Sequence, residues 1–259
     1  MTPVALTIAG SDPSGGAGLQ ADLKPFHQRG VYGMAVISLL TVQNTKTVRE
    51  VLVIDAGKVM AQLDALLEDM PCHAAKTGAL GNERIVRGLA ERAKSFRFPL
   101  VIDPVFSAKH GAPLLLPEGR RVLREELIPH ASLVTPNLDE ASQLAGFEVR
   151  DLDSMERAAR AIAGYGAQAV LVKGGHLEGE AADLLFSGGK VTLLKSERMA
   201  SSHTHGTGCT YSAAITAELA KGSDLETAVE VAKRFITKAI ESSPGLGTGI
   251  GPLNHHVVV

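Results

Sequence analysis

The sequence predicts a three-layer α-β-α sandwich around a mostly parallel central sheet, and three observations support this prediction. Short, almost continuously apolar runs alternate with longer stretches whose apolar residues recur at helical spacing. Such apolar runs are typical of strands that helices cover on both faces. Alternating strands and helices imply crossover connections, which join parallel strands. Because the 259 residues contain no internal repeat or long linker, we expect one domain over 1–259.

The first elements in chain order follow this alternation. Strands are expected in the runs rich in Val, Leu and Ile at 4–9, 34–42, 100–103, 133–135 and 169–174. Helices are expected at 59–70, 82–96 and 154–166, where apolar residues recur every three or four positions. A further helix is expected within TPNLDEASQLAG (135–146), with Asn137 as its N-cap, Glu140 completing a capping box and Gly146 ending it.

The last third of the chain begins with a predicted hairpin. The runs ADLLFS (182–187) and KVTLLK (190–195) flank Gly188-Gly189, a pair that suits a two-residue turn with positive φ. Two helices are expected after it, at about 208–220 and 224–241. The tail at 242–256 is rich in Gly and Pro, so we expect it to be irregular.

Composition excludes several classes of partner. A formal net charge of −2 and an aromatic content of 4% argue against a nucleic-acid-binding protein. No apolar run reaches the roughly 18 residues that span a bilayer, so no membrane segment is expected. The N-terminus lacks a basic segment before its apolar run, which predicts a cytoplasmic protein. Without secretory context, Cys72 and Cys209 are expected to be free thiols.

Polar residues and glycines gather directly after the expected strands. They are Gly10 with the turn that follows it, Gln43, Thr77-Gly78, Asp103-Pro104, Asn137 and Lys173-Gly174-Gly175. In open α/β sheets, ligands bind beyond the carboxyl ends of the strands. The sequence therefore predicts a ligand site along this edge of the sheet.

The segment AGSDPSGGAGLQADLK (9–24) links the first strand to a helix through a glycine-rich turn. Its glycines permit a tight backbone whose amides face a ligand. The segment matches neither the Walker A pattern nor G-x-G-x-x-G, so a simple tight turn is the alternative interpretation. Asp22, just inside the helix, is either a capping or solvated carboxylate or a group that binds a hydroxyl.

The segment HGTGCTYSAA (205–214) is the stronger candidate. Gly206 and Gly208 permit unusual dihedrals, and the free amides of the helix that follows suit an anion. Phosphoryl transfer needs such charge stabilisation and a group that orients or deprotonates the attacking hydroxyl. Cys209 lies where that base is needed, and we expect the helix N-terminus to lower its pKa from about 8.5 toward neutrality. A buried structural cysteine is the alternative.

Two carboxylates and a lysine extend this candidate site. Asp103 and Glu140 are either caps or solvated groups, or they hold a Mg–nucleotide directly or through water. Lys173 is either a surface lysine or a contact for phosphate. The four histidines at 203, 205, 255 and 256 do not form a convincing metal set, and we expect these four to be structural.

In combination and in this order, seven segments resemble the hydroxymethylpyrimidine/phosphomethylpyrimidine kinases, thiamine-pathway members of the ribokinase-like superfamily. They are AGSDPSGGAGLQADLK, TVQNT (41–45), KTGALG (76–81), VIDPVFSAKHG (101–111), TPNLDEA (135–141), VLVKGGH (170–176) and HTHGTGCTYSAAI (203–215). The resemblance covers almost the whole chain. It implies ATP-dependent phosphorylation of 4-amino-5-hydroxymethyl-2-methylpyrimidine, and then of its monophosphate to the diphosphate.

The resemblance also implies residue roles. The pyrimidine is expected against the first glycine loop, in contact with Gly10, Asp22, Gln43, Ala79 and Val105. The anion hole is expected at Gly206, Thr207 and Gly208, with Cys209 as the proposed base. ATP is expected near Asn137, Lys173 and Thr207, and Mg²⁺ near Asp103 and Glu140. The amide of Gln43 can both donate to and accept from an aminopyrimidine edge.

One departure from the family pattern keeps the substrate open. Many relatives have methionine where this chain has Ala79, so the pyrimidine pocket is expected to be roomier. A pyridoxal kinase of the same superfamily is therefore one alternative, and a non-catalytic pyrimidine-binding regulator is the other. Relatives of this kind are often dimers, so a homodimer is expected. The segment VFSAKHGAP (105–113) is the candidate to close over the site.

Overall fold

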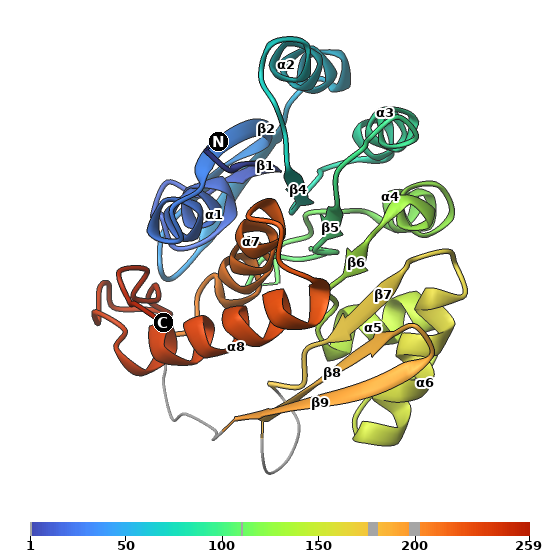
Figure 1. Cartoon of the computed structure of the whole chain (residues 1–259). Helices are drawn as coiled ribbons and strands as arrows, with labels where there is room; N and C mark the ends of the chain where they lie inside the picture. Colours follow the sequence, from blue (N-terminus) through green and yellow to red (C-terminus); the bar gives the residue numbers. More distant parts are fainter. Residues whose placement is uncertain (1, 110, 176–180, 197–202) are drawn as a thin grey trace.

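The computed structural model describes residues 2–109, 111–175, 181–196 and 203–259. His110 of the expected closing segment and His176 of the VLVKGGH segment lie outside these ranges. One nine-stranded sheet runs through the chain in the order β3-β2-β1-β4-β5-β6-β7-β8-β9 (Figure 1). Its strands are Val4–Ser11 (β1), Tyr32–Gln43 (β2), Val48–Val53 (β3), Ala74–Thr77 (β4), Leu100–Ile102 (β5), Leu133–Val134 (β6), Ala169–Val172 (β7), Ala181–Ser187 (β8) and Lys190–Ser196 (β9).

The centre of the sheet is parallel and its two edges are antiparallel. Strands β2, β1, β4, β5, β6 and β7 pair in parallel, while β3 joins β2, and β8 and β9 join β7, in antiparallel fashion. This pattern confirms the predicted mostly parallel sheet. The parallel strands bring their carboxyl ends to one edge, as the sequence predicted.

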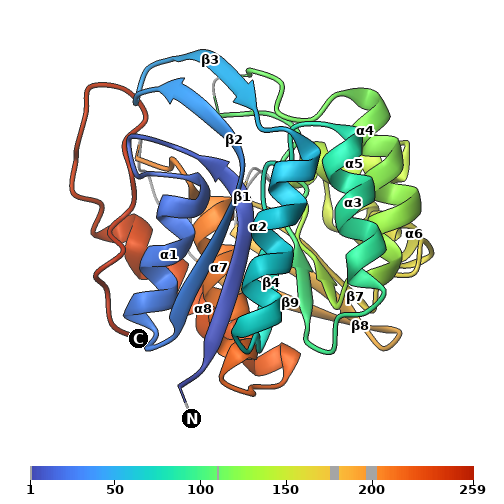
Figure 2. The same ribbon diagram turned by 90° about the horizontal axis from the view of Figure 1, so that it is seen from above.

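Helices cover both faces of the sheet and complete the three layers. One face carries Gly18–Gln28 (α1), Thr207–Ala220 (α7) and Leu225–Glu241 (α8), and the other carries Ala56–Asp69 (α2), Glu83–Ala93 (α3), Pro117–Val122 (α4), Leu138–Ala145 (α5) and Leu152–Ala163 (α6) (Figures 1 and 2). Helix α7 is buried on nearly all sides, between α1, α8 and the sheet. Its small Ala, Ser and Thr residues permit this close approach. None of the helices in the described ranges is long and apolar enough to cross a bilayer.

Local signals predicted several elements well. Asn137 and Glu140 form the expected capping box of α5, and Gly146 ends that helix with a φ of 81°. The β8–β9 turn uses Gly188 and Gly189 with φ of 55° and 82°, as the hairpin pattern predicted. The tail is irregular apart from one bridge at Pro252.

Other elements were not anticipated by the apolar pattern. Strand β3 reads VREVLV and lies at the edge of the sheet, so charged residues interrupt its apolar run. Strand β4 is a four-residue segment with a lysine in it, which apolar run length does not detect. The short helix α4 begins at Pro117 and continues into further helical turns up to His130.

Candidate active site

Two glycine loops, one after β1 and one before α7, touch through their backbones. Gly206 has a φ of 78°, and a Cβ at this position would lie 1.8 Å from the carbonyl oxygen of Gly16. Gly18 has a φ of 59°, and its Cβ would lie 2.3 Å from the carbonyl oxygen of Gly10. Only glycine permits such dihedrals together with such a close approach. The first loop therefore packs directly on the N-terminus of α7.

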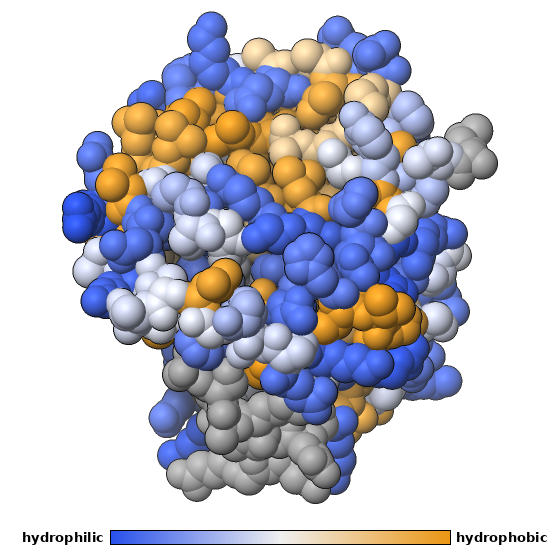
Figure 3. All heavy atoms as spheres, turned by 90° about the vertical axis from the view of Figure 1, so that its left-hand side faces the viewer, coloured by the Kyte–Doolittle hydropathy of each residue, from blue (hydrophilic) through white to orange (hydrophobic). Residues whose placement is uncertain are grey.

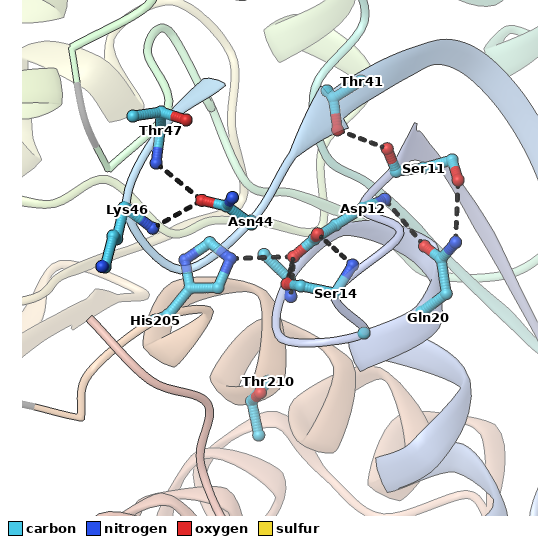
Figure 4. Close-up of polar contacts among 12 residues, drawn as sticks. Ser11, Asp12, Ser14, Gln20, Thr41, Asn44, Lys46, Thr47, His205 and Thr210 are labelled. Carbon is cyan, nitrogen blue, oxygen red and sulfur yellow. Dashed lines mark hydrogen bonds and ion pairs between the residues drawn. The ribbon is translucent and has the colours of Figure 1, made fainter. Parts of the chain in front are cut away.

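Asp12 joins these two loops through its side chain (Figure 4). Its buried carboxylate accepts hydrogen bonds from the backbone N–H and hydroxyl of Ser14 and from the N–H of Ala17, at 2.8 to 2.9 Å. The Nε2 of His205 lies 2.8 Å from Asp12 Oδ2. Burial raises the pKa of Asp12, but hydrogen bonds from His205, Gln43 and Ser14 outweigh burial and hold that pKa well below its usual range. His205 thus ties the second loop to the first.

The N-terminus of α7 presents backbone amides next to Cys209. The N–H of Thr210 donates to the carbonyl of Gly206 at 2.8 Å, so the amides of Gly208 and Cys209 come before the first intrahelical bond. The hydroxyl of Thr207 donates to the carbonyl of Thr204 at 2.9 Å. These amides and the helix dipole form the kind of site that binds an anion.

The thiol of Cys209 is less acidic than the helix position predicted. Burial raises its pKa to about 12, although the ammonium of Lys76 and a hydrogen bond from the backbone of Gly18 act in the opposite direction. The negative charges of Asp22 and Asp103 add to the effect of burial. The expectation of a thiol titrating near neutral pH was therefore wrong, because desolvation outweighs the helix N-terminus in this chain.

Asp103 and Lys173 form an ion pair beneath the second glycine loop. Lys173 Nζ lies 2.8 Å from Asp103 Oδ1, and the hydroxyls of Thr135 and Ser212 donate to the same carboxylate. Burial raises the pKa of Asp103, but the lysine ammonium groups outweigh burial and keep that pKa below its usual range. A Cβ on Gly208 would lie 3.1 Å from Lys173 Nζ and 3.7 Å from Asp103 Oδ2. The pair thus lies directly against the expected anion hole.

Glu140 and Asn137 lie beside this pair at the start of α5. The backbone N–H of Asn137 donates to Glu140 Oε2 at 2.8 Å, and the N–H of Glu140 donates to Asn137 Oδ1 at 2.9 Å. Burial raises the pKa of Glu140 to about 8; Lys173 opposes this shift and the charge of Asp103 adds to it. Asp103 and Glu140 therefore act on each other electrostatically.

Asp22 is one member of a fully buried group. Its Oδ1 accepts from Lys76 Nζ at 2.6 Å, and its Oδ2 accepts from the hydroxyl of Thr7 at 2.6 Å. The side chains of Asp22 and Lys76 are both 0% exposed. Asp22 is thus neither a cap nor a solvated carboxylate, and its two oxygens are held by the protein.

The other residues expected to contact the pyrimidine lie at or just after the ends of strands β1, β2, β4 and β5. A Cβ on Gly10 would lie 3.6 Å from the Cβ of Ala79, so these two residues are neighbours. Gln43 ends β2 and lines a shallow pocket with Val42, Asn44 and Arg49. Val105 is half-buried and lies beside Asp103, to whose carbonyl its N–H donates at 2.9 Å.

Sequence reasoning missed two residues of this site. Asp12 had a local signal, because Asp12-x-Ser14 in a glycine-rich turn is typical of a side chain that caps its own loop. Lys76 had a weaker one: a lysine between apolar residues and a glycine turn at the end of a strand. Their partners, His205 and Asp22, lie far away in sequence, so pattern alone did not connect them.

The fold and this site define a ribokinase-like α/β kinase. A model of the family described as phosphomethylpyrimidine kinase matches residues 12–254. A hydroxymethylpyrimidine/phosphomethylpyrimidine kinase of Haemophilus influenzae is 45% identical to this chain over 256 residues, which cover 96% of this chain and 95% of that protein. This chain belongs to the phosphomethylpyrimidine kinase family, as the resemblance predicted.

Solved structures agree with this assignment. An ADP complex of Bacillus subtilis pyridoxal kinase is 42% identical with a TM-score of 0.91, and the match covers 98% of each chain. A phosphomethylpyrimidine kinase of Clostridium difficile 630 is 42% identical with a TM-score of 0.82, and the match covers 92% of this chain and 99% of that chain. The predicted fold class and enzyme class are thereby confirmed.

Proposed function

We propose that this chain transfers the γ-phosphate of ATP to the hydroxymethyl group of 4-amino-5-hydroxymethyl-2-methylpyrimidine and then phosphorylates the monophosphate to the diphosphate. The contact between Gly206 and Gly16 is the observation that supports this most directly. It brings the expected pyrimidine loop against the N-terminus of α7, where Cys209 and the helix amides lie. The acceptor hydroxyl, the base and the anion hole would then lie next to one another, as phosphoryl transfer requires.

In the first step, the oxygen of the hydroxymethyl group attacks the γ-phosphorus of ATP. The thiolate of Cys209 takes the proton of that hydroxyl group during the attack. The new O–P bond forms while the bond from that phosphorus to ADP breaks. The amides of Gly206, Thr207, Gly208 and Cys209 stabilise the charge of the transferring group. In the second step, the acceptor is a phosphate that is already ionised near neutral pH, so this proton transfer matters less.

The nucleotide is proposed to lie near Asn137, Lys173 and Thr207, with Lys173 as a point charge on phosphate. The position of Lys173 against Gly208 supports this placement. Asp103 and Glu140 fit a Mg²⁺ ion, because their mutual repulsion is of the kind that a bound cation relieves. When bound, Mg²⁺ would be held by Asp103 and Glu140 and would neutralise negative charge on the phosphates.

The Glu140→Gln variant should raise the Mg²⁺ concentration for half-maximal activity by ~10- to 100-fold. Glutamine still accepts from the backbone of Asn137, so the cap of α5 should persist. Because the pKa of Glu140 is about 8, the Mg²⁺ requirement of the parent should fall as pH rises from about 6.5 to 8.5, as the carboxyl ionises. Mg²⁺ titrations at several pH values measure both effects. Asp139→Asn, at an exposed carboxylate next to Glu140, is the control. An unchanged Mg²⁺ requirement in Glu140→Gln would contradict the proposal that Glu140 holds the ion.

The substrate is tested with purified protein, ATP and Mg²⁺ against hydroxymethylpyrimidine, its monophosphate and pyridoxal. We expect kcat/KM to be highest for the two pyrimidines. A preference for pyridoxal would favour the rival that the Bacillus subtilis pyridoxal kinase structure and Ala79 keep open. Tight pyrimidine binding without ATP turnover would favour a regulator.

We also propose that the segment 105–113 closes over the site. The carbonyl of Phe106, near the start of this segment, accepts backbone hydrogen bonds from Leu114 and Leu115.

We further propose that the working unit is a homodimer of single 1–259 domains in the cytoplasm. Both cysteines are free thiols, which is consistent with that location. Leu40 and Leu52 pair across β2 and β3 and are 40% and 54% exposed, and Val42 nearby is 51% exposed. Figure 3 shows hydrophobic residues gathered on the side of the molecule that carries β2 and α1. Such exposed apolar groups are typical of interfaces.

The Leu52→Glu variant should sediment as a monomer at micromolar concentration, whereas the parent sediments as a dimer. A charge in the middle of a buried apolar interface is costly, so association should weaken strongly. Leu116→Glu, at a residue that is 60% exposed before α4, is the matched control and should stay dimeric. A monomeric parent, or equal dissociation of both variants, would contradict this interface.

A further inference from the structure

Three polar side chains form a buried group beneath the N-terminus of α7. Thr7 of β1 and Lys76 of β4 are register partners in the parallel sheet, so their side chains share one face. Asp22 of α1 lies over them and accepts from both at 2.6 Å. All three residues are 0% exposed.

The same helix also reaches the catalytic thiol. The start of α1 lies against the loop that precedes Cys209, because a Cβ on Gly206 would lie 3.2 Å from the Cα of Ala17, and the backbone of Gly18 lowers the pKa of the thiol. Gly18 lies four residues before Asp22, so both lie on one side of α1. Helix α7 packs on α1 and on β4, and Figures 1 and 2 show it between them. The ion pair and the thiol therefore lie in the same small region of the interface between α1, α7 and the sheet.

Stability does not explain this ion pair. Moving two charges out of water costs several kcal/mol per ion, and well-packed apolar residues in place of a buried pair are often as stabilising or more so. A fully buried lysine beside a reacting group is a candidate for an electrostatic role.

We propose that Lys76 is a positioning residue for the reaction: its ammonium, fixed by the carboxylate of Asp22 that Thr7 also holds, stabilises the thiolate of Cys209. This inference rests on the proposed function, in which Cys209 is the base. The thiol loses its proton to solvent, and the resulting thiolate takes the proton of the hydroxymethyl group. Lys76 stays protonated throughout and neither gains nor loses a bond.

The charges around Cys209 agree with this role. Among its charged neighbours, Lys76 has the largest effect on the pKa of Cys209 and lowers it, whereas Asp22 and Asp103 raise it. Lys173 also interacts electrostatically with the thiol. Burial lowers the pKa of Lys76, but the charges of Asp22, Cys209 and Asp103 and the hydrogen bond to Asp22 together outweigh burial and raise that pKa above its usual value, so Lys76 is charged at neutral pH.

The test is the pH dependence of Cys209 alkylation by iodoacetamide, in a Cys72→Ser background so that only Cys209 reacts. Lys76→Met should raise the pKa of Cys209 by about one unit or more, and so slow alkylation at pH 8 by about tenfold or more. Lys76→Arg keeps the positive charge and should restore most of the rate. Arg29→Met removes a less deeply buried ion pair, with Glu218, and should leave the rate unchanged. If Lys76→Met does not fold, the pair replacement Asp22→Asn with Lys76→Met gives the same readout with a smaller shift.

The proposal is overturned if the alkylation rate of Lys76→Met, or of the pair replacement, depends on pH in the same way as that of the parent. Turnover in the first step should fall in parallel with alkylation, and full turnover with slowed alkylation would also overturn it. The base role fails separately: if Cys209→Ala keeps the parent turnover, the proposed function is wrong whatever Lys76 does to the thiol.

Discussion

Replacing Cys209 by alanine should slow phosphorylation of the hydroxymethyl group by ~10²- to 10⁴-fold, the range that a general base contributes. Phosphorylation of the monophosphate should lose far less, because its acceptor oxygen carries no proton that must be removed near neutral pH. The helix amides that stabilise the transferring group remain in the variant. The two steps should therefore separate, and single-turnover assays with each acceptor measure that separation.

The pH dependence of the first step should have a defined sign. Since the pKa of Cys209 is about 12, the thiol is protonated in the neutral range and its thiolate fraction grows about tenfold with each pH unit. The rate of the chemical step should rise with pH between about 7 and 10, and this rise should be absent in Cys209→Ala. The second step should show a much flatter profile.

Cys72→Ala is the matched control for this experiment. Burial also raises the pKa of Cys72 to about 12, and its thiol lies against the carbonyl of Ala74 at the start of β4. Both steps should keep the parent rates in this variant. Equal losses in both steps of Cys209→Ala would contradict the base role and would point to a structural cysteine.

The sequence predicted the architecture well because its signals are local. A run such as VALTIA is apolar at every position, and a capping box or Gly-Gly turn needs only neighbouring residues. Strand β4 shows the limit of this reasoning, since Lys76 interrupts its apolar run and is nevertheless fully buried. Its partner Asp22 comes from a helix 54 positions away, and no local pattern relates the two.

The location of the site was predictable, but its electrostatics were not. The carboxyl ends of parallel strands meet at one edge, which places Asp103, Asn137 and Lys173 together. Whether the pKa of Cys209 is lowered or raised depends on burial and on charges brought in by other elements. The helix N-terminus is visible in the sequence, whereas the desolvation that outweighs it arises only from packing.

Replacing Gly206 by alanine should lower turnover in both steps by ~10²- to 10³-fold, the cost of losing one donor of an oxyanion-type hole. The new Cβ would lie 1.8 Å from the carbonyl oxygen of Gly16, and the φ of 78° is unfavourable for alanine. The loop must therefore move away from the first glycine loop, and the amides of Gly208 and Cys209 move with it. Unlike the loss in Cys209→Ala, this loss should affect both acceptors equally.

Gly30→Ala separates this clash from backbone strain alone. Gly30 has a φ of 74°, close to that of Gly206, but a Cβ there meets no atom within 4 Å. It should cost about 1 to 2 kcal/mol of stability from the left-handed backbone and leave kcat unchanged. Turnover per folded protein, with thermal melts to measure the folded fraction, compares the two variants. Parent-like turnover in Gly206→Ala, or equal losses in Gly30→Ala, would show that the contact between the loops does not position the anion hole.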